Sequence, residues 1–199
     1  MKAAQEEIRV REMSIWVFVG SSLLFACIIV LANYSVQYPV LDTPLTYGAL
    51  SYPLSFLLID VLSEKYSKPQ VLKVLWCGLI LAFIPSLLAS ELSIAIASVC
   101  AFFVSQNLDV YIFFYLKNRF PRLWWLRNNA STIIAQFIDT MIFFHIAFLF
   151  AYPWEQVMAM VFADFCIKAF LALCDTPFFY ALAIRERKQP KITQKRGEV

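Results

Sequence analysis

Six long apolar segments divide the chain, and short polar stretches separate them. The segments cover residues 14–32, 45–62, 71–89, 92–116, 130–152 and 157–184. A bilayer core about 30 Å thick is crossed by about 20 residues of helix, so each segment has a length suited to one crossing. Backbone groups in lipid must be hydrogen-bonded within the segment, which favours helices, and the alternation typical of membrane strands is absent. The pattern predicts an all-α, polytopic membrane protein with six transmembrane helices.

Basic residues gather in the connections on one side of these helices. Sixteen of the 17 Lys and Arg residues lie in the N-terminus, the second connection with its edges, the fourth connection and the tail, and the other connections carry none. They are Lys2, Arg9, Arg11, Lys65, Lys68, Lys73, Lys117, Arg119, Arg122, Arg127, Arg185, Arg187, Lys188, Lys191, Lys195 and Arg196. Short loops rich in Lys and Arg stay in the cytoplasm. We therefore expect both termini to be cytoplasmic and the chain to be a multi-pass protein of the inner cell membrane.

The composition excludes a water-soluble globule. Of the 199 residues, 61% are hydrophobic and only 16% are charged, against roughly 25% charged residues in soluble domains. The mean hydropathy is +0.67, so the lipid bilayer is the expected surrounding. The formal net charge of +3 is too small for non-specific nucleic-acid binding, and no nucleic acid is expected as a direct partner. No linker interrupts the segments, so residues 1–199 are expected to form one integral membrane domain, with 185–199 as a polar basic tail.

The motifs of common enzymes and metal sites are absent from the sequence. The five cysteines show no Cys-x-x-Cys or Cys/His spacing, and we interpret them as small apolar packing residues. There is no glycine-rich phosphate loop, nucleophile elbow or His-Glu-x-x-His motif. We therefore expect no catalytic residues, no metal and no cofactor.

Ionisable residues inside the apolar segments are the strongest functional signal. Each costs about 2.5–3.5 kcal/mol at a helix centre, so such residues are expected to face a cavity or one another. They are Asp60, Asp109, Asp139, Asp164, Lys168 and Asp175. On an ideal helix, most of them share a stripe about 60° wide or narrower with other polar residues. The three stripes are Ser98, Ser105 and Asp109; Thr132, Gln136 and Asp139; and Asp164, Lys168 and Asp175. Three helices are therefore predicted to turn polar lines towards one shared interior.

The same residues also have a purely structural interpretation. Asp164 and Lys168 are four residues apart and could form an intrahelical ion pair that only lowers the insertion cost. Asp60 lies two residues from the end of its segment and could reach water beside Lys65, and Glu64 is expected at the level of the lipid headgroups. Five carboxylates face only one ammonium, whereas a network that serves stability alone would tend towards balance. The surplus of carboxylates favours a ligand that is cationic or rich in hydrogen-bond donors. A buried carboxyl group could also bind a proton or another ion and so couple transport to it.

Pro53 interrupts the second segment. Its missing N–H and its ring free a backbone carbonyl one turn earlier, which membrane proteins tolerate where a neighbour or a cavity pairs with it. Both a plain kink and a broken helix that lines a substrate site fit this pattern.

Five short motifs resemble one known family. They are Asn33-Tyr-Ser-Val-Gln37, the run from Thr46 to Asp60, Gln106-Asn-Leu-Asp-Val110, the stretch from Trp125 to Thr140, and Asp164-Phe-Cys-Ile-Lys168. Taken in order, they are similar to the queuosine precursor transporter family within the vitamin uptake transporters. The resemblance implies a six-helix inner-membrane importer of 7-deazaguanine precursors of queuosine, which are salvaged for tRNA modification.

The matching motif positions supply the candidate substrate-binding residues. These are Asn33, Tyr47, Asp60, Gln106, Asp109, Gln136, Asp139, Asp164 and Lys168. A guanine-like edge presents an N1–H beside an exocyclic amine, which one carboxylate can accept in a bidentate manner, and Asp139 or Asp109 is the preferred contact. Gln106 and Gln136 could bind the purine carbonyl, while aromatic residues such as Tyr52 stack on the ring. The resemblance thus implies a purine-like small-molecule substrate, carried by alternating access around an intramembrane Asp/Gln/Lys cluster.

Two other classes stay open at this point. A substrate-binding S subunit of an energy-coupling-factor vitamin importer is also small and six-spanned. Such subunits dock through an Ala-x-x-x-Ala patch in the first helix, where this chain has only Ala26 and Ala32, six residues apart. A membrane scaffold without transport is the other class. Ala159 and Ala163 form a small-x-x-x-small pair that could pack two helices within or between chains, so a homo-oligomer is possible.

Overall fold

The described part of the protein is helical throughout. The computed structural model describes residues 12–38, 40, 46–89, 91–148 and 150–185. Its helices are α1 (Ile15–Ser35), α2 (Tyr47–Ser51), α3 (Pro53–Lys65), α4 (Lys68–Ala89), α5 (Leu92–Arg119), α6 (Trp124–Phe148) and α7 (Trp154–Phe179), followed by a π-helical turn, η1 (Tyr180–Ile184). Five of them are long and apolar enough to cross a membrane, namely α1, α4, α5, α6 and α7 with η1. The all-α membrane architecture is confirmed, whereas the sixth crossing is not established.

The second apolar segment is divided into two short helices. α2 has five residues and α3 has 13, and Tyr52 separates them. Pro53 has no N–H to continue the helical hydrogen bonds, while Tyr52 keeps helical backbone angles (φ −58°, ψ −46°), so the interruption is a kink and not an unwound stretch. Ser51 Oγ donates to the Gly48 carbonyl at 3.1 Å and Ser55 Oγ to the Tyr52 carbonyl at 2.9 Å. Both carbonyls also accept a backbone N–H, from Tyr52 and from Ser55, so the hydroxyls add second hydrogen bonds around the kink.

α6 begins six residues before the predicted start at residue 130. Hydropathy underestimated this helix because its first turns contain polar residues that are buried in the bundle, among them Arg127 and Asn128. The end of the same segment was predicted at residue 152, but α6 ends at Phe148.

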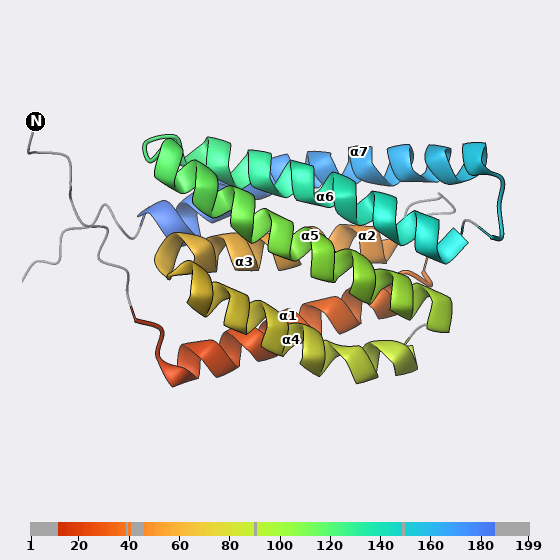
Figure 1. Ribbon diagram of the computed structural model, residues 1–199, viewed down its shortest axis with the longest axis horizontal. Helices are drawn as coiled ribbons and strands as arrows, with labels where there is room; N and C mark the ends of the chain where they lie inside the picture. Colours follow the sequence, from red (N-terminus) through yellow and green to blue (C-terminus); the bar gives the residue numbers. More distant parts are fainter. Residues whose placement is uncertain (1–11, 39, 41–45, 90, 149, 186–199) are drawn as a thin grey trace, which may run out of the picture.

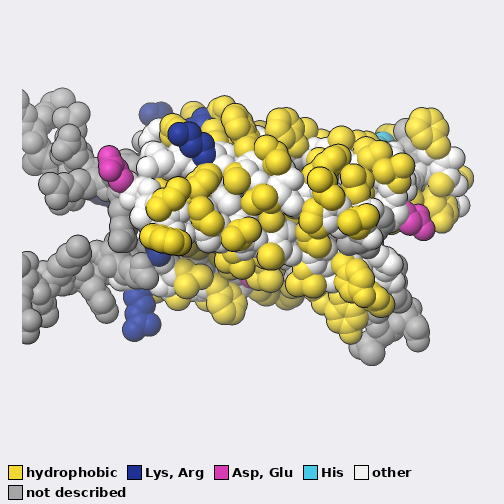
Figure 2. All heavy atoms as spheres, turned by 90° about the horizontal axis from the view of Figure 1, so that it is seen from below, with side chains coloured by type: hydrophobic (Ala, Val, Ile, Leu, Met, Phe, Trp, Pro, Cys, Tyr) yellow, Lys and Arg dark blue, Asp and Glu magenta, His cyan; other side chains and the backbone are white. Residues whose placement is uncertain are grey.

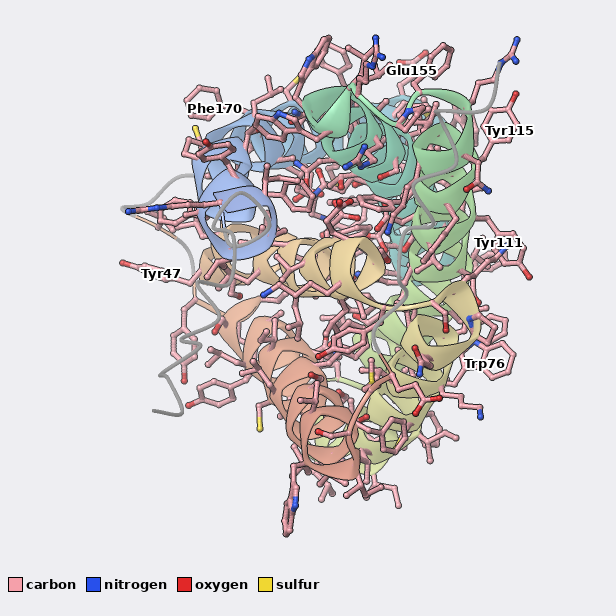
Figure 3. The ribbon with its side chains drawn as sticks, turned by 90° about the vertical axis from the view of Figure 1, so that its left-hand side faces the viewer. Tyr47, Trp76, Tyr111, Tyr115, Glu155 and Phe170 are labelled. Atoms are coloured by element: carbon pink, nitrogen blue, oxygen red, sulfur yellow. The ribbon has the colours of Figure 1, made fainter. Side chains whose placement is uncertain are left out.

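The helices lie side by side along the long axis of the molecule (Figure 1). α1 packs against α4, and α5 packs against α6, which in turn packs against α7. α3 lies between these two groups, as the view along the bundle shows (Figure 3). One side of α3 carries Phe56, Ile59 and Leu62, which belong to a buried apolar core with residues of α1 and α4 such as Phe25 and Val74. Leu57 and Val61 of α3 pack on a second apolar cluster that includes Phe113 of α5 and Phe179 of α7. α3 also makes polar contacts with α5 and α6.

Basic side chains lie at one end of the bundle. We call the end where α3 ends and α6 begins, with Lys65, Lys117 and Arg119, the basic end; the far end is where α6 ends and α7 begins. Figure 2 shows Lys and Arg near the basic end and hydrophobic side chains over most of the face between the ends. Trp16 and Ile80 are among the most exposed hydrophobic side chains, as expected of surfaces that face lipid. The arrangement agrees with the charge pattern of the sequence, and the cytoplasmic position of the basic end stays a prediction.

The small-residue pair of α7 is not buried between helices. Ala159 and Ala163 are both exposed, and Ala163 borders a cavity, so the pair does not serve helix packing within the described part of the chain. A homo-oligomer through this pair stays a prediction. The tail beyond residue 185 lies outside the described residues.

Two glycines allow a direct test of the packing of α2 on α1. A Cβ atom on Gly48 would meet the Ala32 carbonyl oxygen at 2.7 Å and the Val36 nitrogen at 2.9 Å, whereas one on Gly20 would meet nothing within 4 Å. Because the neighbours of Gly48 include rigid backbone, we expect Gly48→Ala to destabilise the protein by about 1–3 kcal/mol. Gly20→Ala should leave stability nearly unchanged. Thermal unfolding of both variants in detergent measures the difference, and equal melting temperatures would contradict this packing.

Candidate functional site

A cavity of about 670 Å³ lies towards the far end, between α2, α5, α6 and α7. Aromatic and aliphatic side chains form most of its wall, and Asp164 and Lys168 are its two charged residues. The lining residues are Val36, Thr46, Gly48, Tyr52, Ile94, Ser98, Phe143, Phe144, Phe148, Tyr152, Met160, Ala163, Asp164, Ile167 and Lys168. Mostly apolar walls with a few polar groups, at this size, are typical of sites for small molecules.

The two charged residues of the cavity belong to a buried ion cluster. Lys168 Nζ lies 2.8 Å from Asp164 Oδ2 and 3.5 Å from Asp139 Oδ2. Ser105 Oγ donates to Asp139 Oδ1 at 2.9 Å, and Thr140 Oγ1 donates to Asp164 Oδ2 at 3.3 Å. The intrahelical pair of Asp164 and Lys168 is therefore present, and α6 adds a second carboxylate to it. We call Asp139, Asp164 and Lys168 the ion trio; with all three ionised, its net charge is −1.

Tyr52, the residue that precedes α3, contacts the ion trio through its ring. Its ring stacks on Phe102 at a centroid distance of 4.3 Å with an interplanar angle of 18°. Lys168 Nζ lies 4.3 Å from the centroid of the Tyr52 ring, which is a favourable cation–π distance. The Tyr52 hydroxyl is buried and has no hydrogen-bond partner among the described residues. The kink before Pro53 places Tyr52 at the cavity, close to Asp139 and Asp164.

A second group of polar side chains lies deeper, between the cavity and the basic end. Thr132 Oγ1 donates to Asp60 Oδ2 at 2.9 Å, and Gln106 Nε2 donates to Ser55 Oγ at 3.0 Å. Asp109 lies beside Asp60 and close enough to interact with it. Several buried atoms of this group have no hydrogen-bond partner within the part of the chain that the structure describes. They are Asp60 Oδ1, both carboxylate oxygens of Asp109, Gln106 Oε1, and Gln136 Oε1 and Nε2. We call Asp60, Gln106, Asp109, Thr132 and Gln136 the inner polar layer.

The other candidate residues lie apart from both groups. Asn33 on α1 is fully buried, and its amide has no partner among the described residues. Tyr47 is 50% exposed and points away from the bundle (Figure 3), although its neighbours Thr46 and Gly48 line the cavity. Of the nine candidates, Asp164 and Lys168 therefore line the cavity, Asp139 lies behind them, four more form the inner polar layer with Thr132, and two lie elsewhere.

The two acidic residues of α3 are both buried. Asp60 is 1% exposed, so the alternative in which it reaches water beside Lys65 does not hold. Glu64 is fully buried, which corrects the expectation that it is solvated, and Arg127 binds its carboxylate with Nε–Oε2 and Nη2–Oε1 distances of 3.0 Å and 2.9 Å. Periodicity cannot reveal this pair, since its members are 63 residues apart in the sequence. A carboxylate near a helix end and an arginine within the first turns of another helix are the only signals the sequence contained.

These features define the class of the protein before any comparison. Apolar helices enclose ionisable groups that lipid would penalise, and two of these groups, Asp164 and Lys168, line a cavity. This is the arrangement of a multi-pass membrane transporter, in which polar groups near the middle of the membrane surround a ligand.

Comparison with known proteins identifies the family. A family model described as a putative vitamin uptake transporter matches residues 84–182. A probable queuosine precursor transporter of Bacillus subtilis is 33% identical over 68% of this chain and 70% of the relative. The queuosine precursor transporter of Escherichia coli is 31% identical over 76% of this chain and 79% of the relative, and a probable one of Haemophilus influenzae is 28% identical over 82% and 83%. No solved structure matches the chain significantly. The chain belongs to the queuosine precursor transporter family, as the sequence motifs indicated, and is a transporter and not an enzyme.

The ion trio predicts an asymmetric response to neutralising substitutions. Lys168→Gln leaves Asp139 and Asp164 without a cation, and an uncompensated buried charge costs about 3–5 kcal/mol. Asp164→Asn removes only one of two partners, so Lys168 keeps Asp139 and the loss should be smaller. The melting temperatures of the two variants in detergent test this order. Adding Asp139→Asn to Lys168→Gln should recover part of the lost stability. A lower melting temperature for Asp164→Asn than for Lys168→Gln would contradict the pairing.

Proposed function

We propose that the protein imports 7-deazaguanine-type precursors of queuosine across the inner membrane for use in tRNA modification. The names of its relatives support this substrate class. The observation that carries the proposal is the cavity of about 670 Å³, with aromatic walls and with the Asp164–Lys168 pair on its floor. Such a site offers stacking surfaces for a flat ring and charged partners for its polar edge.

Asp164 is the carboxylate that an entering substrate meets first. Its side chain is 17% exposed, whereas that of Asp139 is fully buried behind Lys168. A guanine-like edge donates two parallel N–H groups, which suit one carboxylate. Phe143, Phe144 and Phe148 line the same cavity and offer aromatic faces for the ring. We therefore assign the first contact with the substrate to Asp164. Asp139 and Asp109 would bind the substrate later, as it moves through the protein.

The direction of import follows from the position of the cavity. If the basic end is cytoplasmic, as positively charged connections require, the cavity opens towards the outside. Alternating access then moves the substrate past the ion trio to the inner polar layer and releases it at the basic end. In this proposal, the conformation with the cavity at the far end is the one that receives the substrate.

The structure gives less support to an S subunit of an energy-coupling-factor importer. Ala26 and Ala32 are 7% and 0% exposed, so neither offers a docking patch on the surface of α1. A membrane scaffold without transport does not require a cavity lined by a charged pair, so the cavity favours a transporter over a scaffold.

Uptake measurements test the substrate and the site together. In cells that cannot synthesise 7-deazaguanines, we expect Asp164→Asn to lower the uptake of a radiolabelled 7-deazaguanine base at least about tenfold, because a charge-assisted bidentate contact is lost. Glu155→Gln is the matched control, since Glu155 is an exposed carboxylate in the first turn of the same helix. Uptake that is equal in both variants and in the parent would remove Asp164 from the site, and no uptake by the parent would reject the substrate.

The inner polar layer predicts coupling to protons. Asp60 and Asp109 are neighbouring buried carboxylates, and neither forms an ion pair with any cation that the structure describes. Like charges in such a position favour binding of one proton to the pair. In proteoliposomes we expect a pH gradient that is acidic outside to accelerate uptake several-fold, and Asp109→Asn to abolish the acceleration. An uncoupler should abolish it in the parent. Uptake that responds only to a sodium gradient would contradict proton coupling.

A further inference from the structure

A buried charge cluster closes the interior at the basic end, beyond the inner polar layer. Arg127 binds the Glu64 carboxylate through two nitrogens, at 3.0 Å and 2.9 Å. Lys117 Nζ donates to the carbonyl oxygens of Ser63 at 2.6 Å and Glu64 at 3.0 Å, and it lies 4.0 Å from Glu64 Oε2. These contacts join the end of α3 to the end of α5 and the beginning of α6. We call Glu64, Lys117 and Arg127 the lock.

Aromatic side chains cover the lock. The Arg127 guanidinium carbon lies 6.0 Å from the centroid of the Phe113 ring, and Lys117 Nζ lies 5.9 Å from it. Phe179 packs against Phe113 and against Trp124, with centroid distances of 6.2 Å in both cases. The lock residues are at most 7% exposed. Ion pairs shielded from water in this way are stronger than exposed ones, so the cluster makes a tight seal.

The lock lies one helical turn from polar groups that have no partners. Asp60 precedes Glu64 by four residues on α3, and Ser131 follows Arg127 by four residues on α6. Ser63 Oγ and Asn128 Oδ1, next to the lock, are buried and have no hydrogen-bond partner among the described residues. A buried polar atom without a partner costs about 1–3 kcal/mol. A whole layer of such atoms is better explained by a path that water and substrate enter when the lock opens.

α3 connects the lock to the cavity. At its start, Tyr52 contacts Lys168 of the ion trio; in its middle, Asp60 contacts Thr132; at its end, Glu64 enters the lock. These contacts with α6 and α7 are polar and can be exchanged for water or substrate. Apolar residues of α3 pack on α1 and α4, and Leu57 and Val61 pack on a second apolar cluster that includes Phe113 of α5 and Phe179 of α7. Because α3 links the lock to the cavity floor, a shift of α3 would open the lock and change the cavity floor in one movement.

We propose that Glu64, Lys117 and Arg127 form the inner gate of the transport path. The gate is closed while the cavity is open at the far end, and it opens when substrate at the ion trio releases α3. This inference rests on the alternating access of the proposed function, but it names residues that lie outside the substrate site.

Cysteine labelling measures the state of both ends of the path independently of the substrate. In the full chain with its five native cysteines replaced, Ser131→Cys reports on the path behind the lock, and Ser98→Cys reports on the cavity. Both serines are buried, at 0% and 1% exposure. A membrane-impermeant maleimide is applied to vesicles of each orientation, and a cysteine at the exposed Arg119 establishes which vesicles present the basic end.

Loss of the lock should act oppositely on the two reporters. We expect Arg127→Gln to raise the labelling rate of Ser131→Cys from the basic end about tenfold or more, because Glu64 loses its main partner. Labelling of Ser98→Cys from the far end should fall. Lys117→Gln, which leaves the Glu64–Arg127 pair in place, should act in the same direction but more weakly. Combining Glu64→Arg with Arg127→Glu should return both rates towards those of the parent.

Arg122→Gln is the matched control, because it removes a basic residue from the same end of the bundle at an exposed position. The gate is rejected if Arg127→Gln and Lys117→Gln leave the rates unchanged in folded protein, or if Arg122→Gln has the same effect. A rise at both reporters indicates general loosening and also rejects it. If the labelling rates change as expected but the parent does not take up a 7-deazaguanine, the gate is supported and the proposed substrate is rejected. If the parent takes up the 7-deazaguanine but the labelling rates do not change, the substrate is supported and the gate is rejected.

Discussion

The constraint on which the structure depends is that lipid offers no partner to a polar group. Every charged or polar side chain within the bundle must be satisfied by other side chains, water or a ligand. The lock meets this condition by placing Arg127 and Lys117 around one carboxylate, and the ion trio meets it by placing Lys168 between two. The position of α3 follows from the same condition, since Ser55 and Asp60 find polar partners on α5 and α6, while its apolar residues pack on α1 and α4 and on Phe113 and Phe179.

The buried polar groups differ in how completely they are satisfied, and this difference carries functional information. Glu64 and Lys168 have several close partners, which makes them suitable as fixed elements of a seal and of a cavity floor. Gln136 has no partner for either polar atom of its buried side chain within the described residues. An apolar residue of similar size in that position would cost less free energy, so stability alone does not account for Gln136. In the proposed transport cycle, such unsatisfied groups are the ones that would bind water or substrate.

Much of the fold could be predicted from the sequence, because apolar length and the cost of buried charge act locally. Helix positions and the polar stripes of α5, α6 and α7 follow from periodicity, and so does the intrahelical pair of Asp164 and Lys168. The pairing of Glu64 with Arg127 could not be predicted, since it depends on how α3 meets α6. Hydropathy also placed the start of α6 too late, because a hydropathy scale scores an arginine as polar even where it is buried in the bundle. The kink at Tyr52 was one of two open alternatives, and only the backbone angles decide between them.

The kink at Tyr52 divides the second apolar segment into α2 and the longer, central α3. Thirteen residues of α3 rise about 20 Å against a bilayer core of about 30 Å, so α3 reaches membrane-spanning length only together with α2, and the kink allows the two to differ in direction. α3 lies between the other helices, so its ends do not have to match the membrane surface and its backbone can be satisfied by neighbours. Its contacts with α6 and α7 include polar ones that water or substrate can replace, namely Asp60 with Thr132 and Tyr52 with Lys168. A shift of this helix would break few fixed contacts of that kind, which is what the proposed alternating access requires.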